Sequence, residues 1–217
     1  VVHGATVLST IVVFYRDIWK LIKGLLAFRW NDESIYVAKL FVSMIPVIIL
    51  GLFFKDEIEG FFTGNVFFVG FMLIVTSLLL LSTYLVKKNE RKIGFYDSFF
   101  IGLAQALAVL PGISRSGATI STGLLLGNKK ANIARFSFLM VLIPIIGANA
   151  KDVFDGSMTA ENGVGLLPLL VGFIAAFISG LLACKWMIGI VKKGKLLYFA
   201  IYCFLIGSAA IIYTLTL

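Results

Sequence analysis

The sequence predicts an all-α polytopic membrane protein with one transmembrane domain over residues 1–217. Of its residues 60% are hydrophobic and only 14% are charged, against roughly 45–50% and 25% in soluble domains. The apolar residues form long blocks, several of them close to the length of about 20 residues that spans a bilayer. Basic and acidic loops alternate between these blocks, as they do in multi-pass membrane proteins.

The expected helices follow the apolar blocks in chain order. These blocks occupy residues 1–15, 35–54, 66–86, 95–110, 117–126, 133–150, 164–191 and 196–217. After the first block, residues 16–30 mix Trp, Leu and Phe with Arg and Lys. That mixture is typical of an amphipathic helix lying on the inner membrane surface.

The loop charges predict the topology. Basic loops lie at residues 16–29, 87–92, 129–135 and 192–195, whereas residues 55–59 and 151–161 are acidic. Basic loops belong on the cytoplasmic side, which accounts for the net charge of +8 without a nucleic-acid partner. The chain has one histidine and two cysteines, and they form no Cys/His cluster, so no metal ligand is predicted within it.

A re-entrant hairpin is predicted over about residues 95–127. The basic loops on either side both belong inside, so the intervening chain must enter the membrane and return. Its two apolar blocks have about 16 and 10 residues, or roughly 24 and 15 Å as helix, and neither is comfortably long enough for a full span. We expect the tip, at residues 111–117, to reach toward the outside.

The tip carries residues suited to an oxyanion, most plausibly a phosphate. Arg115 at membrane depth costs at least ~2.5–3.5 kcal/mol, so it needs a partner or a function, and its planar fork fits two phosphate oxygens. Ser114 or Ser116 could cap the next helix and leave first-turn N–H groups free for an anion. The alternative is a proline-broken turn whose arginine extends to the interface or pairs with a carboxylate. Hydroxyl groups on both sides of the arginine favour the anion site.

The same stretch supplies further candidates. Gly112 and Gly117 permit close backbone approach, and Thr119 lies on the same helical face as Ser116. Gln105 lies about two and a half turns before the tip, and a helix–helix hydrogen bond is an equally open role. Ser137 on the next helix either lines the cavity or only packs.

The residues at 111–119 match the signature Pro-Gly-x-Ser-Arg-Ser-Gly-x-Thr. The match extends upstream through Gly102 and Gln105 and downstream through residues 135–139 to Pro144. At these residues the chain resembles the undecaprenyl-diphosphatase family, also called bacitracin-resistance proteins. The resemblance covers essentially the whole chain.

This resemblance implies a multi-pass enzyme of the bacterial inner membrane that hydrolyses undecaprenyl diphosphate to the monophosphate, which recycles the carrier lipid of cell-wall synthesis. It also implies an inverted-repeat helical bundle whose two halves each carry a re-entrant hairpin. Ser114 and Arg115 would act in catalysis, Ser116 and Thr119 would hold the diphosphate with Gln105 nearby, and Mg²⁺ or Ca²⁺ would neutralise it. The expected partners are the substrate, membrane lipid and, as a further candidate, a second copy in a homodimer.

Two motifs of the family's first hairpin do not occur in this sequence: a glutamate-rich segment and a Pro-x-Ser-Ser-Thr-Gly-His stretch. We therefore expect that roughly the first 45–50 residues of a complete member are missing, with the cation ligands among them. On that basis the chain alone is expected to be inactive. The competing hypothesis is a secondary transporter or flippase of a lipid phosphate, because such proteins also use inverted repeats and broken helices.

Overall fold

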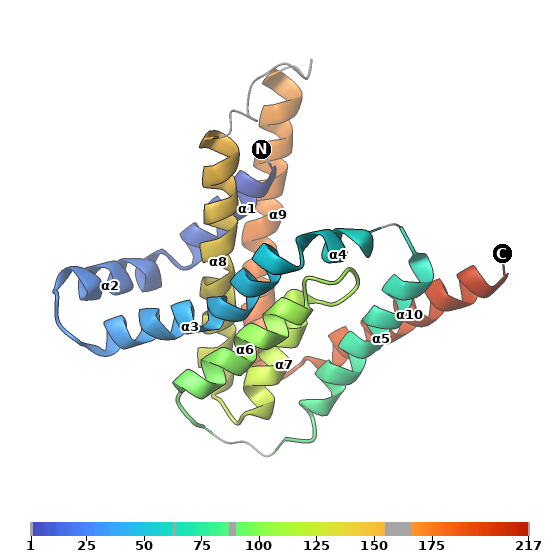
Figure 1. Ribbon diagram of the computed structural model, residues 1–217, viewed down its shortest axis with the longest axis horizontal. Helices are drawn as coiled ribbons and strands as arrows, with labels where there is room; N and C mark the ends of the chain where they lie inside the picture. Colours follow the sequence, from blue (N-terminus) through green and yellow to red (C-terminus); the bar gives the residue numbers. More distant parts are fainter. Residues whose placement is uncertain (1, 63, 87–89, 155–165, 217) are drawn as a thin grey trace. The chain divides into compact units, whose positions relative to one another are not determined.

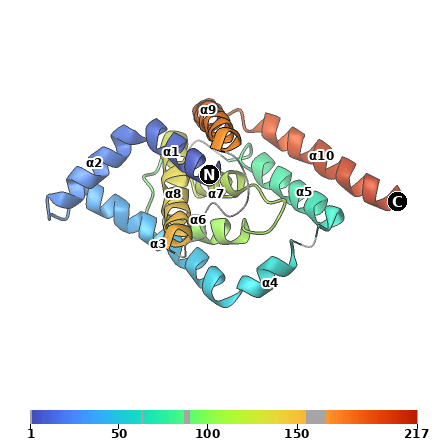
Figure 2. The same cartoon turned by 90° about the horizontal axis from the view of Figure 1, so that it is seen from above.

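The computed structural model describes residues 2–62, 64–86, 90–154 and 166–216, which form helices and their connections without a strand among them. Contacts group them into two compact units, Val1–Val37 with Phe138–Gly189 and Ala38–Ser137 with Ile190–Leu217. The single domain over residues 1–217 remains a prediction. The helices (Figures 1 and 2) are α1 Val2–Val13, α2 Tyr15–Leu26, α3 Asp32–Phe53, α4 Lys55–Gly60, α5 Val66–Ser82, α6 Phe95–Leu107, α7 Arg115–Leu125, α8 Lys130–Phe154, α9 Leu166–Lys193 and α10 Leu197–Thr216.

Four of these helices are long and apolar enough to cross a membrane: α3, the first 18 residues of α8, α9 from Leu167 onward, and α10. Helices α5 and α1 are apolar but shorter. These helices confirm the predicted class, an all-α membrane protein. The inverted repeat remains a prediction.

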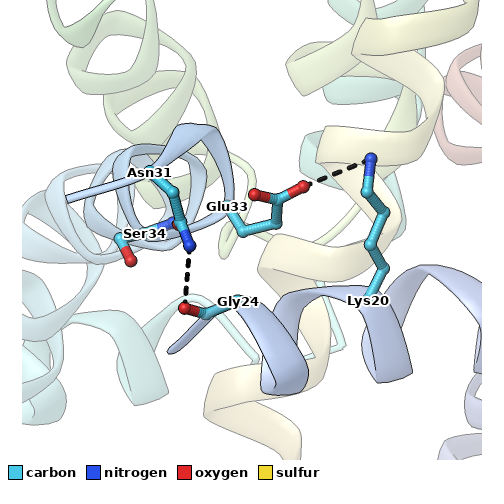
Figure 3. Close-up of polar contacts among 5 residues, drawn as sticks. All are labelled: Lys20, Gly24, Asn31, Glu33 and Ser34. Atoms are coloured by element: carbon cyan, nitrogen blue, oxygen red, sulfur yellow. Dashed lines mark hydrogen bonds and ion pairs between the residues drawn. The ribbon is translucent and has the colours of Figure 1, made fainter. Parts of the chain in front are cut away.

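In the first unit, polar contacts fix the connection from α2 to α3 (Figure 3). The side-chain amide of Asn31 donates to the carbonyl oxygen of Gly24 at 2.9 Å and accepts from the amide of Ser34 at 2.8 Å. Lys20 forms an ion pair with Glu33 at 3.2 Å. The predicted amphipathic helix is thus present as α2, although it ends at Leu26 rather than at residue 30.

In the second unit, α6 and α7 pack against each other as a helix–loop–helix hairpin (Figure 1). A backbone bridge closes its root: the amide of Arg91 donates to Gly127 O, and the amide of Lys129 donates to Arg91 O, both at 3.2 Å. The two basic loops therefore meet at one end of the hairpin, as the charge pattern predicted. With 13 and 11 residues, the helices are roughly 20 and 17 Å long, consistent with a re-entrant segment.

Helix α6 begins with a buried capping contact. The carboxylate of Asp97 accepts from the amide of Gly94 at 2.8 Å. Its residue is only 5% exposed, so this cap is buried.

Helices α5 and α10 lie side by side in the same unit (Figures 1 and 2). The hydroxyl of Ser77 on α5 donates to Ala200 O on α10 at 2.7 Å. Gly70 and Gly207 bring the two backbones close together, because a Cβ at either glycine would contact the other's carbonyl oxygen within 3 Å. Of these two helices, α5 also contacts α7 of the hairpin.

Gly102 sets the distance between α6 and α3. A Cβ there would collide with the backbone of Ser43, with the Cα and carbonyl carbon both at 2.8 Å. Gly102→Ala is therefore expected to lower thermal stability in detergent by about 1–3 kcal/mol, the usual cost of overpacking. Gly51 on α3 is the control, since nothing lies within 4 Å of an added Cβ and alanine favours helix. Equal melting temperatures for the two variants would contradict this packing.

Candidate functional site

The hairpin tip contains a glycine that the local backbone requires. Gly112 has φ +93°, a conformation that costs other residues roughly 1–2 kcal/mol. A Cβ at this position would meet the carbonyl oxygen of Val69 at 2.6 Å and the Cβ of Met72 at 2.9 Å. Close contact with α5 therefore fixes where the tip lies.

Ser114 is the N-cap of α7. Its hydroxyl accepts from the amide of Gly117 at 3.1 Å, and its backbone is extended. Of the two serines considered, the structure selects Ser114. Because the first N–H groups of a helix have no intrahelical acceptor, the amides of Arg115 and Ser116 remain available, and no partner for them occurs in the described ranges.

Thr76 on α5 holds this cap in place. Its hydroxyl accepts from the amide of Ser114 at 3.1 Å and donates to Met72 O at 3.1 Å, with Gly112 O at 3.4 Å. A larger residue in place of Gly117 would crowd the cap, because an added Cβ would lie 3.0 Å from Ser114 and 3.4 Å from Thr76. Sequence reasoning missed Thr76, although a Thr-Ser pair inside an apolar block was a visible signal.

Arg115 is the exposed cation of the tip. Within the part of the chain that the structure describes, no carboxylate pairs with it. Carboxylate pairing, one of the two structural alternatives, is therefore absent among those residues. The guanidinium, two helix-end amides and the half-buried Ser116 hydroxyl belong to the same short turn, which suits an oxyanion.

Thr119 and Ser137 are brought together. Their hydroxyl oxygens lie 2.6 Å apart, and both residues are at most 1% exposed. The hydroxyl of Thr119 also lies 2.9 Å from Arg115 O. If Thr119 donates to that carbonyl, Ser137 donates to Thr119, and the chain of hydrogen bonds joins α8 to the first turn of α7. These hydrogen bonds suit a role of Thr119 and Ser137 in positioning α7. Direct contact of either residue with a ligand remains a prediction.

Thr119→Val should lower stability by about 1–3 kcal/mol, because it leaves the buried Ser137 hydroxyl unpaired. The double variant Thr119→Val/Ser137→Ala should recover part of this loss, since both partners are then apolar. Thr122→Val on the same helix is the control. Additive losses in thermal unfolding would show that the two hydroxyls do not depend on each other.

Gln105 is buried on α6, with 2% exposure. Its Oε1 has no hydrogen-bond partner in the described part of the chain, so this atom does not make the helix–helix bond considered as its alternative role. A role in ligand binding stays a prediction for this residue.

The described residues do not fit a divalent cation. No group of three or more His, Cys, Asp or Glu side chains gathers within those ranges. The tip offers amides, hydroxyls and a guanidinium, which bind anions rather than cations. The site as described is therefore one that receives negative charge.

The chain is similar to known proteins over nearly its whole length. The family model described as Bacitracin resistance protein BacA matches residues 1–209. A protein of Christiangramia forsetii named undecaprenyl-diphosphatase is 52% identical over 213 residues, which cover 98% of this chain and 80% of that protein. Proteins with the same name from Bacteroides thetaiotaomicron and Methanococcus vannielii are 54% and 39% identical, and the matches cover 98% and 97% of this chain and 81% and 82% of theirs.

These matches bear on one expectation from the sequence. Because the relatives align with nearly all of the chain, they do not support the expectation that the chain alone is inactive. Activity is therefore a question for experiment.

Proposed function

Because the chain belongs to the family of the bacitracin resistance protein BacA, we propose that it hydrolyses undecaprenyl diphosphate to undecaprenyl phosphate and inorganic phosphate. In this reaction water adds to the terminal phosphorus and the anhydride P–O bond breaks, leaving the monophosphate on the lipid. The observation that carries the proposal is the tip of the α6–α7 hairpin, where Arg115 lies exposed beside a capped helix N-terminus.

The tip suits this substrate because a diphosphate carries several negative oxygens and gains charge on its bridging oxygen as the anhydride bond breaks. Fixed donors aimed at developing charge are a large contribution to phosphoryl-transfer catalysis. The guanidinium of Arg115 would donate hydrogen bonds to two oxygens of the diphosphate, and the amides of Arg115 and Ser116 would donate to a third. Ser114 acts through its cap, which orients those amides.

The setting of the proposal is the bacterial inner membrane, with the lipid tail in the bilayer and the tip reaching toward the outside. Mg²⁺ or Ca²⁺ is the expected cation, and no step here depends on it. A homodimer also remains a prediction, which the mass of the detergent-solubilised protein would test.

The test is phosphate release from undecaprenyl diphosphate by the purified protein in detergent, with Mg²⁺ or Ca²⁺ and with a chelator in parallel. Release of one inorganic phosphate per lipid is expected, and a fall in release on chelation would support the expected cation. A folded protein that binds the lipid but releases no phosphate would overturn the proposal. Movement of a labelled lipid phosphate across proteoliposomes would then favour the transporter or flippase.

A further inference from the structure

A polar cavity lies at the root of the hairpin, in the same unit as the tip. It has a volume of about 750 Å³, and its lining includes Asn128, Lys129, Lys130, Lys192, Lys193 and Gly194. Asn128 follows the end of α7, whereas Arg115 begins that helix, so the cavity and the tip lie at opposite ends of about 17 Å of helix. The cavity is therefore separate from the site proposed above.

The charge of this cavity is strongly positive. Lys129 pairs with Glu90 at 3.1 Å, but no carboxylate in the described ranges lies within ion-pair distance of Lys130, Lys192 or Lys193. The amino group of Lys130 occupies the space beside Gly194, where an added Cβ would collide with it. Lys130 also begins α8, whose N-terminal end adds partial positive charge.

Asn128 gives the cavity an unsatisfied polar group. The residue is 2% exposed, and neither its Nδ2 nor its Oδ1 has a hydrogen-bond partner in the part of the chain described. A buried amide without partners is unfavourable and is normally satisfied by protein, water or ligand. Next to three unpaired lysines, its N–H groups suit an anion.

The surroundings identify the kind of anion. Tyr84, which lines the cavity, and its neighbour Leu85 are 69% and 85% exposed, so apolar surface adjoins the charge. The lysines belong to basic loops, which face the cytoplasmic leaflet. Basic pockets between membrane helices on that side bind the head groups of anionic lipids. A free anion would interact with the lysines but not with the apolar surface of Tyr84 and Leu85.

We propose that the cavity formed by Asn128, Lys130, Lys192 and Lys193 binds the phosphate group of an anionic membrane lipid in the cytoplasmic leaflet. The site binds this lipid without changing it. The lipid connects the end of α9 and the start of α8 to the hairpin root, so its binding should stabilise the protein.

The test measures the rise in melting temperature of the protein in neutral detergent as phosphatidylglycerol is added, with phosphatidylcholine in parallel. Phosphatidylglycerol alone should stabilise. Lys130→Gln/Lys192→Gln/Lys193→Gln should weaken its apparent affinity at least about tenfold, since each lysine near anionic lipid contributes about fivefold. The control Arg16→Gln/Lys23→Gln/Arg29→Gln removes the same charge from another basic loop and should weaken it by about twofold or less. Equal weakening in both variants would indicate diffuse attraction and overturn the proposal.

Asn128→Leu gives a second test that does not depend on net charge. Without lipid its melting temperature should equal or exceed that of the parent, because an unpartnered amide is replaced by an apolar group. The rise caused by phosphatidylglycerol should shrink. An undiminished rise, or the same rise with inorganic phosphate alone, would show that the cavity does not hold a lipid head group.

Discussion

Phosphate release from undecaprenyl diphosphate is expected to fall by about 10³-fold or more when Arg115 is replaced by alanine. Loss of one donor to developing charge typically costs roughly 10²–10³-fold, and loss of an arginine in phosphoryl transfer roughly 10³–10⁵-fold. Because Arg115 is exposed and forms no ion pair in the described part of the chain, its truncation should leave the melting temperature nearly unchanged. Activity and thermal unfolding, measured on the same preparation, check both statements.

Arg115→Lys separates charge from geometry. Lysine keeps the charge but not the two-pronged fork, so we expect an intermediate rate, with kcat reduced more than KM is raised. Arg29→Ala, at another exposed arginine, is the matched control and should retain full activity. If Arg115→Ala hydrolyses the lipid within threefold of the parent, the arginine only extends to the interface.

The hairpin could be predicted from sequence because its signals are local. Two basic loops bracket apolar blocks too short to span, which requires the chain to return, and the bridge from Arg91 to residues 127–129 brings those loops together. The serine cap could be narrowed to Ser114 or Ser116 for the same reason. It depends on residues within one turn of each other.

The support of the tip could not be predicted, because it depends on residues far apart in sequence. Thr76 lies 38 residues before the Ser114 amide that it accepts from, and one sequence gives no sign of that pairing. Thr119 and Ser137 were each considered separately as candidate ligand contacts, but they bond to each other across two helices. Polar residues inside apolar blocks marked the right positions without revealing their partners.

Gly112→Ala is expected to lower both stability and activity through the placement of the tip. The variant adds roughly 1–2 kcal/mol of backbone strain and a clash with Val69 and Met72 on α5 of about 1–3 kcal/mol. Relief of the clash moves residues 112–114 away from Thr76, and Ser114 and Arg115 move with them. A displacement of about 1 Å can cost roughly 10²-fold in rate, so phosphate release should fall by about that factor in protein that is still folded.

Gly64→Ala isolates the contribution of the clash. Gly64 also has a positive φ, +78°, but nothing lies within 4 Å of an added Cβ. This variant should therefore show the strain in its melting temperature and keep its activity. If Gly112→Ala lost no more activity than Gly64→Ala, contact between the tip and α5 would not set the position of Arg115. In that case Thr76→Val, which removes the acceptor of the Ser114 amide without a clash, should also be fully active. The structure predicts the opposite result: Gly112→Ala and Thr76→Val both lose rate, and Gly64→Ala does not.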